Sequence, residues 1–183
     1  MHKRRLIKLT TAFVGALLAY AAAKAAPNVS PAATVPSGGY FKVEQVFDGD
    51  TIAVKINGTV EKVRFLGVDT PETHDPRKPV QCFGREAAAW TSQALVGRSV
   101  RLETDSAQGE RDKYGRLLAY VWRDDGVLVN QELIMNGYAH EYTYQVPYKY
   151  QQTFQAEEAR AQEKQLGLWS PSTCGGNTKQ PAR

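Results

Sequence analysis

The stretch that decides the fold runs from Val46 to Thr73 and reads VFDGDTIAVKINGTVEKVRFLGVDTPET. Residues 51–56 and 60–68 are short runs rich in Val, Ile and other residues that are typical of β-strands. Asn57-Gly58 between the two runs is a strong signal for a two-residue hairpin turn. The stretch therefore predicts a β-hairpin that is preceded by a turn at Asp48-Gly49-Asp50.

Further strands and helices are expected on both sides of this hairpin. Strands are predicted at residues 40–47, 99–103 and 116–122, and helices at 84–96, from a cap at Asn130 to Gly137, and at 148–166. One helix follows the third strand and two follow the fifth. This order predicts an α+β fold in one domain over residues 40–169, a five-stranded OB-fold β-barrel with three helices.

The two ends of the chain differ in composition from the domain. Residues 1–25 combine basic residues, a short apolar run and the site Ala23-Lys24-Ala25, which predict a signal peptide for a secreted or periplasmic protein. An N-terminal membrane anchor is the alternative, although the apolar run is short for a membrane span. Residues 26–39 are expected to form a flexible leader and residues 170–183 a disordered tail.

The net charge of +4 does not by itself indicate binding to nucleic acid. Five of the 23 basic residues precede Ala25, and without them 18 basic residues face 19 acidic ones. Affinity for a polyanion therefore requires a local basic site.

The sequence contains two cysteines, Cys82 and Cys174. An even number of cysteines in an exported chain predicts a disulfide, and two free thiols are the alternative. Their spacing fits no zinc site, because a second pair of Cys or His ligands is missing.

Polar residues that the fold does not need gather at strand ends. Asp50 and Asp69 are carboxylates from two turns, and such oxygens can hold a hard divalent cation. Arg64 lies in an apolar run, on the same face as Leu66, where a charge is costly without a partner. Glu72 can accept a proton from water.

Residues 111–116, Arg-Asp-Lys-Tyr-Gly-Arg, form a basic loop with one aromatic ring. Arginine donates two parallel hydrogen bonds that match a phosphate group. Each of these segments alone could be an ordinary turn or a solvated loop. Together they are the components of a phosphodiesterase that needs no histidine.

The sequence resembles the thermonuclease family of staphylococcal (micrococcal) nuclease-like enzymes from about residue 40 to 169. The resemblance rests on VFDGDTIAV, VRFLGVDTPET, CFGREA, ERDKYGRLLAYVW, DGVLVNQELIMNGYA and LGLWS, in the order of the family. It implies a calcium-dependent nuclease that hydrolyses DNA and RNA and leaves 3′-phosphate ends. Single-stranded substrate is expected to be favoured, and the chain is expected to be a monomer without a stable protein partner.

The resemblance also implies roles for individual residues. The calcium ligands correspond to Asp50, Asp69 and the backbone carbonyl of Thr70, and the catalytic glutamate corresponds to Glu72. The residues with the remaining roles are Arg64 and Arg116, which bind phosphate, Asp48, which supports the metal site, and Lys113 and Tyr114, which contact a terminal phosphate.

One segment departs from the family pattern. Direct alignment places Thr143 where the family has one of two tyrosines before Pro147, and a small shift would bring Tyr142 or Tyr144 there instead. A non-catalytic nucleic-acid-binding module and a phosphodiesterase for small nucleotides are the alternative functions. The binding module would be expected to lose site residues, but the metal carboxylates, the glutamate and both arginines are present.

Overall fold

A computed structural model describes residues 38–76 and 79–182 of the chain. The predicted signal peptide or anchor and nearly all of the predicted leader lie outside the described residues. Within the described part, no helix is long and apolar enough to cross a membrane.

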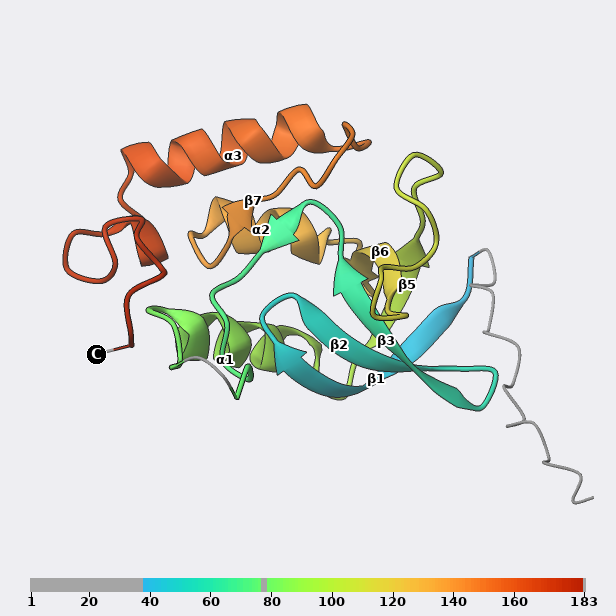
Figure 1. Cartoon of the computed structure of the whole chain (residues 1–183). Helices are drawn as coiled ribbons and strands as arrows, with labels where there is room; N and C mark the ends of the chain where they lie inside the picture. The colour runs from blue at the N-terminus through green and yellow to red at the C-terminus, as the bar shows by residue number, and fades with distance from the viewer. Residues whose placement is uncertain (1–37, 77–78, 183) are drawn as a thin grey trace, which may run out of the picture. The chain divides into compact units, whose positions relative to one another are not determined.

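Five strands form a closed barrel in the order β1-β2-β3-β6-β5, which confirms the predicted fold (Figure 1). The strands are β1 (Tyr40–Asp48), β2 (Thr51–Ile56), β3 (Thr59–Phe65), β5 (Ser99–Glu103) and β6 (Leu117–Arg123). Neighbouring strands are antiparallel, except that β3 and β6 are parallel. Asn57 and Gly58 have positive φ angles of 49° and 84° and form the predicted hairpin turn between β2 and β3.

The prediction of one continuous strand over residues 60–68 is wrong, because the strand ends at Phe65. The chain bends at Leu66 and Gly67 and then forms β4 (Val68–Asp69), which pairs with β7 (His140–Glu141) in a separate two-stranded sheet. Gly67 has a φ of 72°, and a Cβ atom there would lie 2.6 Å from the ring of Tyr148. Only glycine allows this close approach. The bend places Asp69 at the barrel end.

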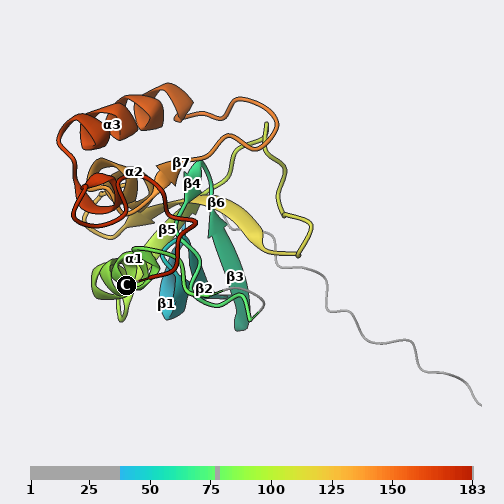
Figure 2. The ribbon, with the colours of Figure 1, turned by 60° about the vertical axis from the view of Figure 1, so that its left-hand side comes forward.

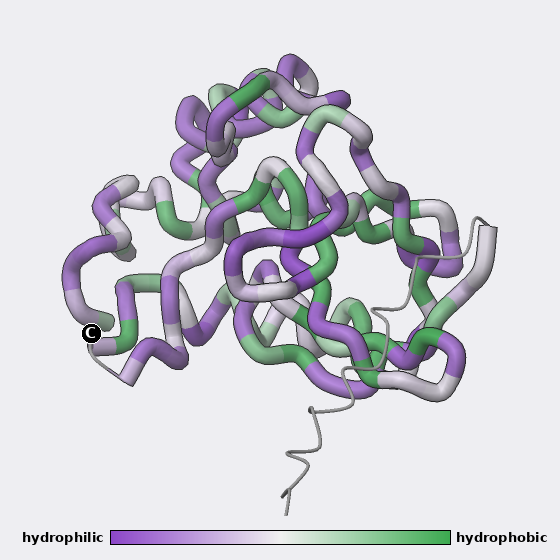
Figure 3. The backbone as a smooth tube through the Cα atoms, turned by 45° about the vertical axis from the view of Figure 1, so that its right-hand side comes forward, coloured by the Kyte–Doolittle hydropathy of each residue, from purple (hydrophilic) through white to green (hydrophobic). Residues whose placement is uncertain are grey.

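Helices pack on the outside of the barrel. They are α1 (Gly84–Leu95), α2 (Val129–Met135) and α3 (Gln151–Glu163), followed by the short 3-10 helix η1 (Gly167–Trp169). Helix α1 contacts β1, and α2 contacts both β6 and α3. Figure 2 shows α3 beyond α2 as seen from the barrel. Figure 3 shows that most residues of α3 are hydrophilic.

Two predicted helix boundaries need correction. The last helix was expected over residues 148–166 but spans Gln151–Glu163, and Tyr148 before it lies buried in the core next to Gly67. Asn130 does not cap α2 but lies within the first turn of this helix. Its buried side chain accepts a hydrogen bond from the Val121 N–H (2.8 Å) and donates one to the Leu66 carbonyl (2.8 Å). Asn130 therefore joins β6 to the bend after β3.

The prediction of a disordered tail after residue 169 is wrong for the described residues. Residues 170–182 form a series of turns, and Cys174 forms a disulfide with Cys82, as predicted. An isolated antiparallel bridge joins Pro181 to Gln81. Figures 1 and 2 both show the end of the chain beside the start of α1. The tail lacks apolar periodicity, but the disulfide and these backbone pairs order it.

Candidate active site

The Asp48-Gly49-Asp50 turn between β1 and β2 lies against helix α1. The Thr91 hydroxyl of α1 donates a hydrogen bond of 2.7 Å to the Gly49 carbonyl. A Cβ atom on Gly49 would lie 2.7 Å from the Thr70 methyl group and 3.0 Å from Ala87. The glycine therefore lets the turn approach Thr70 closely, and this approach brings Asp50 beside the β4 segment.

Arg64 on β3 joins the two predicted metal carboxylates. Its Nη1 lies 3.2 Å from Asp50 Oδ2, and its Nη2 lies 3.1 Å from Asp69 Oδ1. Nη1 also donates to the backbone carbonyls of Phe65 (3.1 Å) and Val68 (2.6 Å). The Arg64 side chain is only 14% exposed, so these partners supply the charge compensation that its position requires. One guanidinium in contact with both carboxylates means that Asp50 and Asp69 lie close together.

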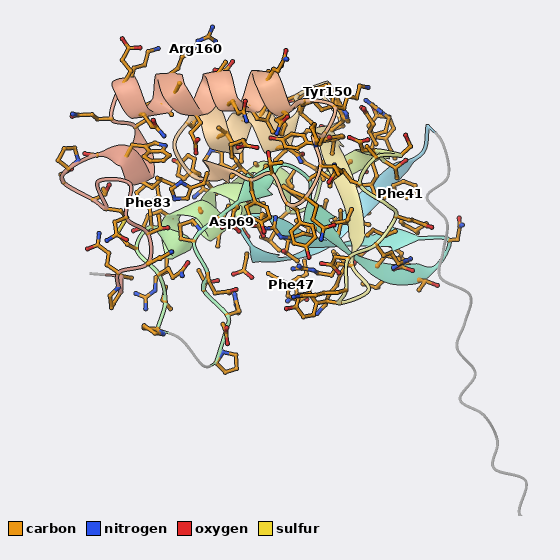
Figure 4. The ribbon with its side chains drawn as sticks, turned by 45° about the horizontal axis from the view of Figure 1, so that its top comes forward. Phe41, Phe47, Asp69, Phe83, Tyr150 and Arg160 are labelled. Carbon is orange, nitrogen blue, oxygen red and sulfur yellow. A yellow bond between two sulfur atoms is a disulfide. The ribbon has the colours of Figure 1, made fainter. Side chains whose placement is uncertain are left out.

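The two carboxylates differ in environment. Asp50 is buried, and it accepts hydrogen bonds from the Thr51 hydroxyl (2.9 Å) and the Thr70 N–H (2.8 Å). Asp69 has a more exposed side chain, 54% against 7% for Asp50, and Figure 4 labels it in the central part of the view. Desolvation and the neighbouring Asp50 carboxylate raise the pKa of Asp69, although Arg64 acts in the opposite direction. The two carboxylates and Arg64 together carry a net negative charge, which a bound cation would neutralise.

The chemistry of these groups fits calcium. Asp50, Asp69 and the Thr70 carbonyl offer only hard oxygen donors, which suit Ca²⁺. The Thr70 hydroxyl beside them is buried and has no hydrogen-bond partner in the described structure. No group of three His, Cys, Asp or Glu side chains that could hold a metal occurs among the described residues. Water or substrate would therefore have to supply the remaining ligands.

Glu72 and Asp48 both contact His74. The Glu72 carboxylate accepts a hydrogen bond from the His74 N–H (2.7 Å) and lies close enough to Asp69 to contribute to its raised pKa. Asp48 Oδ1 accepts a hydrogen bond from the Thr73 hydroxyl and lies 3.0 Å from His74 Nδ1. Asp48 therefore stabilises the segment that follows Glu72, and its hydrogen bonds are to this segment rather than to Asp50 or Asp69.

Arg116 is oriented by Asp112, a residue to which sequence reasoning gave no role. Both Nε and Nη2 of Arg116 lie 2.6 Å from Asp112 Oδ2. Asp112 Oδ1 also accepts the backbone N–H groups of Tyr114 (2.9 Å) and Arg116 (3.0 Å). The guanidinium lies 5.4 Å from the Tyr114 ring centre, and the Lys113 ammonium lies 5.1 Å from it. The sequence signal for this role was the i, i+4 spacing of Asp112 and Arg116 around a turn at Gly115.

A cavity of about 580 Å³ is lined both by Arg64 and by the basic loop that carries Arg116. We call the side formed by residues 48–50, 64 and 69–72 the strand-end wall, of which Arg64 and Asp69 line the cavity. The opposite side, residues 104–116 and 142–147, is called the loop wall, and its lining includes Lys113, Tyr114 and Arg116. Asp48, Asp50, Thr70 and Glu72 are not lining residues. Asp50 contacts the lining residue Arg64 and accepts the Thr70 N–H, and Glu72 lies close enough to Asp69 to affect its pKa. Asp48 contacts Thr73 and His74 instead.

The loop wall carries both of the tyrosines that flank Thr143. Tyr142 and Tyr144 both line the cavity, and their ring centres are 6.4 Å apart. Thr143 between them donates a hydrogen bond to Glu141 (2.6 Å) and accepts one from Gln151 (2.6 Å). Thr143 therefore fixes the segment, while the tyrosines on both sides of it remain exposed to the cavity.

Comparison with known proteins identifies the family. The family model for staphylococcal nuclease homologues matches residues 62–171. The chain belongs to the staphylococcal nuclease family. It is 42% identical to the thermonuclease of Staphylococcus hyicus over 130 residues, which are 71% of this chain and 75% of that protein. The staphylococcal nuclease-like fold that was predicted from the sequence is therefore confirmed.

Other relatives agree with this assignment. The thermonuclease of Staphylococcus intermedius is 42% identical over 132 residues, which are 72% of this chain and 77% of that protein. Endonuclease YncB of Bacillus subtilis is 40% identical over 131 residues, which are 71% of this chain and 61% of that protein. These similarities confirm the prediction that the chain is a hydrolase of the nuclease class.

Proposed function

We propose that the chain is a calcium-dependent endonuclease that hydrolyses phosphodiester bonds of DNA and RNA and leaves 3′-phosphate ends. The observation that carries this proposal is the contact of one guanidinium, Arg64, with both Asp50 and Asp69 at the edge of the cavity that Arg116 also lines. The site thus combines two carboxylates for a hard cation with two cations for a phosphate.

The two arginines bind the scissile phosphate from opposite walls. Asp112 binds Nε and Nη2 of Arg116 and leaves Nη1 to donate to a phosphate oxygen. The preorganised charges stabilise the negative charge that grows on the phosphoryl oxygens as water attacks phosphorus. When bound at Asp50, Asp69 and the Thr70 carbonyl, calcium supplies Lewis-acid chemistry and neutralises charge.

Glu72 orients the attacking water and takes its proton. The oxygen–phosphorus bond to water then forms while the bond from phosphorus to the 5′ oxygen breaks, and the leaving 5′ oxygen takes a proton from solvent water. The hydrogen bond from the His74 N–H fixes one oxygen of the Glu72 carboxylate and leaves the other available for water.

The exposed tyrosines of the loop wall favour an unpaired substrate. Tyr114, Tyr142 and Tyr144 are 72%, 45% and 64% exposed, respectively, and all three line the cavity. Aromatic rings stack on bases of any identity once the bases are unstacked from a duplex. We therefore propose single-stranded DNA and RNA as the preferred substrates, with little dependence on base sequence and with the enzyme acting as a monomer.

The proposed location of the enzyme is outside the cytoplasm. We propose that residues 1–25 direct the chain to the periplasm or out of the cell, or anchor it at the membrane. The Cys82–Cys174 disulfide is consistent with this proposal, because such bonds persist in oxidising compartments.

The test is turnover of long single-stranded DNA in calcium and then in excess chelator. We expect activity only with calcium, 3′-phosphate ends on the products, and at least about a hundredfold loss of turnover in Glu72→Gln. Full activity in chelator would refute the calcium requirement. A binding module would bind DNA without turnover, and a small-nucleotide phosphodiesterase would leave long DNA intact.

A further inference from the structure

Gln81 contacts the backbone of Glu72 on both sides of this residue. The Glu72 N–H donates a hydrogen bond of 2.8 Å to Gln81 Oε1, and the Gln81 N–H donates one of 2.9 Å to the Glu72 carbonyl. The side chain and the backbone of Gln81 therefore act together on one peptide segment. The amide plane on each side of the Glu72 Cα is fixed by the same residue.

The first turn of helix α1 limits the space on another side of this segment. A Cβ atom on Gly84 would lie 3.0 Å from the Pro71 carbonyl oxygen and 3.1 Å from that of Glu72. The helix start thus packs directly on the Pro71–Glu72 backbone. Contact with α1 opposes a shift of the Glu72 backbone toward the helix, and the two hydrogen bonds to Gln81 oppose its displacement from this position.

The C-terminal segment in turn fixes Gln81. We call residues 174–182 the C-terminal strap. The Cys82 N–H donates to the Gln180 carbonyl and the Ala182 N–H donates to the Val80 carbonyl, both at 2.8 Å. Gln180 Nε2 donates to the Cys174 carbonyl (3.1 Å), and Cys174 forms the disulfide with Cys82. Both ends of the strap are therefore fastened to residues 80–82.

We propose that Gln81 is a positioning residue for Glu72 and that the disulfide-fastened strap holds Gln81 in place. This inference rests on the catalytic role of Glu72 in the proposed function. A general base must lie within hydrogen-bond reach of the proton it takes. A displacement of about 1 Å can cost on the order of a hundredfold in rate, so residues that fix the Glu72 backbone affect turnover without touching the substrate.

The first experiment compares Gln81→Met with Gln131→Met. Methionine keeps the length of glutamine but removes the acceptor for the Glu72 N–H, and Gln131 is a partly buried glutamine of α2 that contacts Glu157 instead. For Gln81→Met we expect kcat on single-stranded DNA to fall tenfold to about a hundredfold with KM changed less than about twofold. We expect no such change in Gln131→Met. An unchanged kcat in folded Gln81→Met would overturn the proposal.

Two further readouts separate positioning from a general structural role. In a Glu72→Gln background, Gln81→Met should cause no further loss of kcat, whereas the same loss in both backgrounds would overturn the proposal. Hydrogen exchange of the Glu72 N–H should become about fivefold faster in Gln81→Met, because a hydrogen bond is lost. If Glu72→Gln alone keeps wild-type turnover, the proposed role of Glu72 fails, and the exchange rate still reports whether Gln81 holds the segment.

The strap is tested by a chain that ends at Thr178. This variant keeps the Cys82–Cys174 disulfide and the contact of Thr178 with His140, but it lacks the residues that pair with 80–82. We expect a lower kcat, an unchanged KM and the same faster exchange at the Glu72 N–H as in Gln81→Met. Wild-type kcat and exchange in this shortened chain would show that Gln81 needs no strap and would overturn that part of the proposal.

Discussion

The two walls of the cavity are built in opposite ways. In the strand-end wall, Asp50 is 5% exposed and the Arg64 side chain is 14% exposed, and each has several partners from different strands. In the loop wall, Tyr114 is 72% exposed and Tyr144 is 64% exposed, and both lie on segments between regular elements. The barrel and the C-terminal strap support the first wall, while a few hydrogen bonds between loops support the second.

The difference in burial between the two walls matches their proposed roles, which are transition-state stabilisation for the strand-end wall and base stacking for the loop wall. Groups that stabilise a transition state must be fixed before the reaction, because their reorganisation would cost free energy. Rings that stack on bases contribute to binding and accept any base, because every base offers a π-face. Changes in the support of the strand-end wall should therefore lower kcat, and changes in the rings of the loop wall should raise KM.

The largest expected effect concerns the support of the strand-end wall. Replacing Cys82 and Cys174 together by Ala removes a link between residues 92 positions apart, and the chain-entropy model assigns such a link about 4–5 kcal/mol as an upper value. Urea unfolding should show a lower free energy of unfolding, and kcat should fall while KM stays. Equal stability of the double variant and the oxidised wild type would contradict this prediction.

The second effect concerns Arg116, the residue of the loop wall that serves the reaction itself. In Arg116→Ala, turnover of single-stranded DNA with calcium should fall at least about a hundredfold, the scale for losing one preorganised charge contact. The melting temperature should change little, because Asp112 keeps its hydrogen bonds from the Tyr114 and Arg116 N–H groups. Arg160→Ala is the matched control, since Figure 4 shows Arg160 on α3, away from Asp69. Near wild-type turnover in folded Arg116→Ala would refute the assignment.

The barrel and most of its elements could be predicted from local patterns. The Asn57-Gly58 turn and the β-branched runs around it specify the hairpin without help from distant residues. The break after Phe65 could not be predicted, because it depends on Tyr148, a residue remote in sequence that packs on Gly67. The order of the tail was missed for the same reason, since its partners are residues 80–82.

In the candidate site, too, some residues could be recognised from the local sequence, while others depend on contacts in the folded chain. Asp50, Arg64 and Asp69 were recognised from strand ends and from the family resemblance, and the structure brings them into contact. The roles of Asp112 and Gln81 were not recognised, because both act through backbone N–H and carbonyl groups whose positions follow only from the folded chain. Positioning residues are therefore harder to find in a sequence than the groups they position.

The third prediction tests the loop wall by removing an exposed ring. In Tyr144→Ala, KM for single-stranded DNA should rise about fivefold or more while kcat stays within about twofold, because stacking on a base contributes roughly 1–3 kcal/mol. Steady-state kinetics give both constants. Tyr40→Ala is the control, since Tyr40 is also exposed but does not line the cavity. A fall in kcat without a rise in KM would place Tyr144 in the chemistry and would contradict the proposed division between the walls.

The smallest expected effect concerns Asp105, which joins residues 104–116 of the loop wall to Lys149, two residues beyond the other half of that wall. Its carboxylate accepts hydrogen bonds from the Lys149 N–H (2.9 Å), the Ala107 N–H (3.0 Å) and the Tyr120 hydroxyl (2.8 Å). Burial raises the pKa of Asp105, but these hydrogen bonds outweigh burial and lower it below its ordinary value of 3.8.

The sign of the pH dependence follows from this lowered pKa. A carboxylate with a lower pKa in the folded state stabilises the fold above pH 3.8, and this stabilisation is lost as the pH falls through the folded-state pKa. Asp105→Asn should therefore lower the free energy of unfolding at pH 7 by about 1 kcal/mol or less, because the group is partly exposed to solvent. Urea unfolding at several pH values should show that the difference from wild type shrinks below pH 3.8. A difference that stays constant down to the acid transition would show that the charge of Asp105 does not hold the loop wall together.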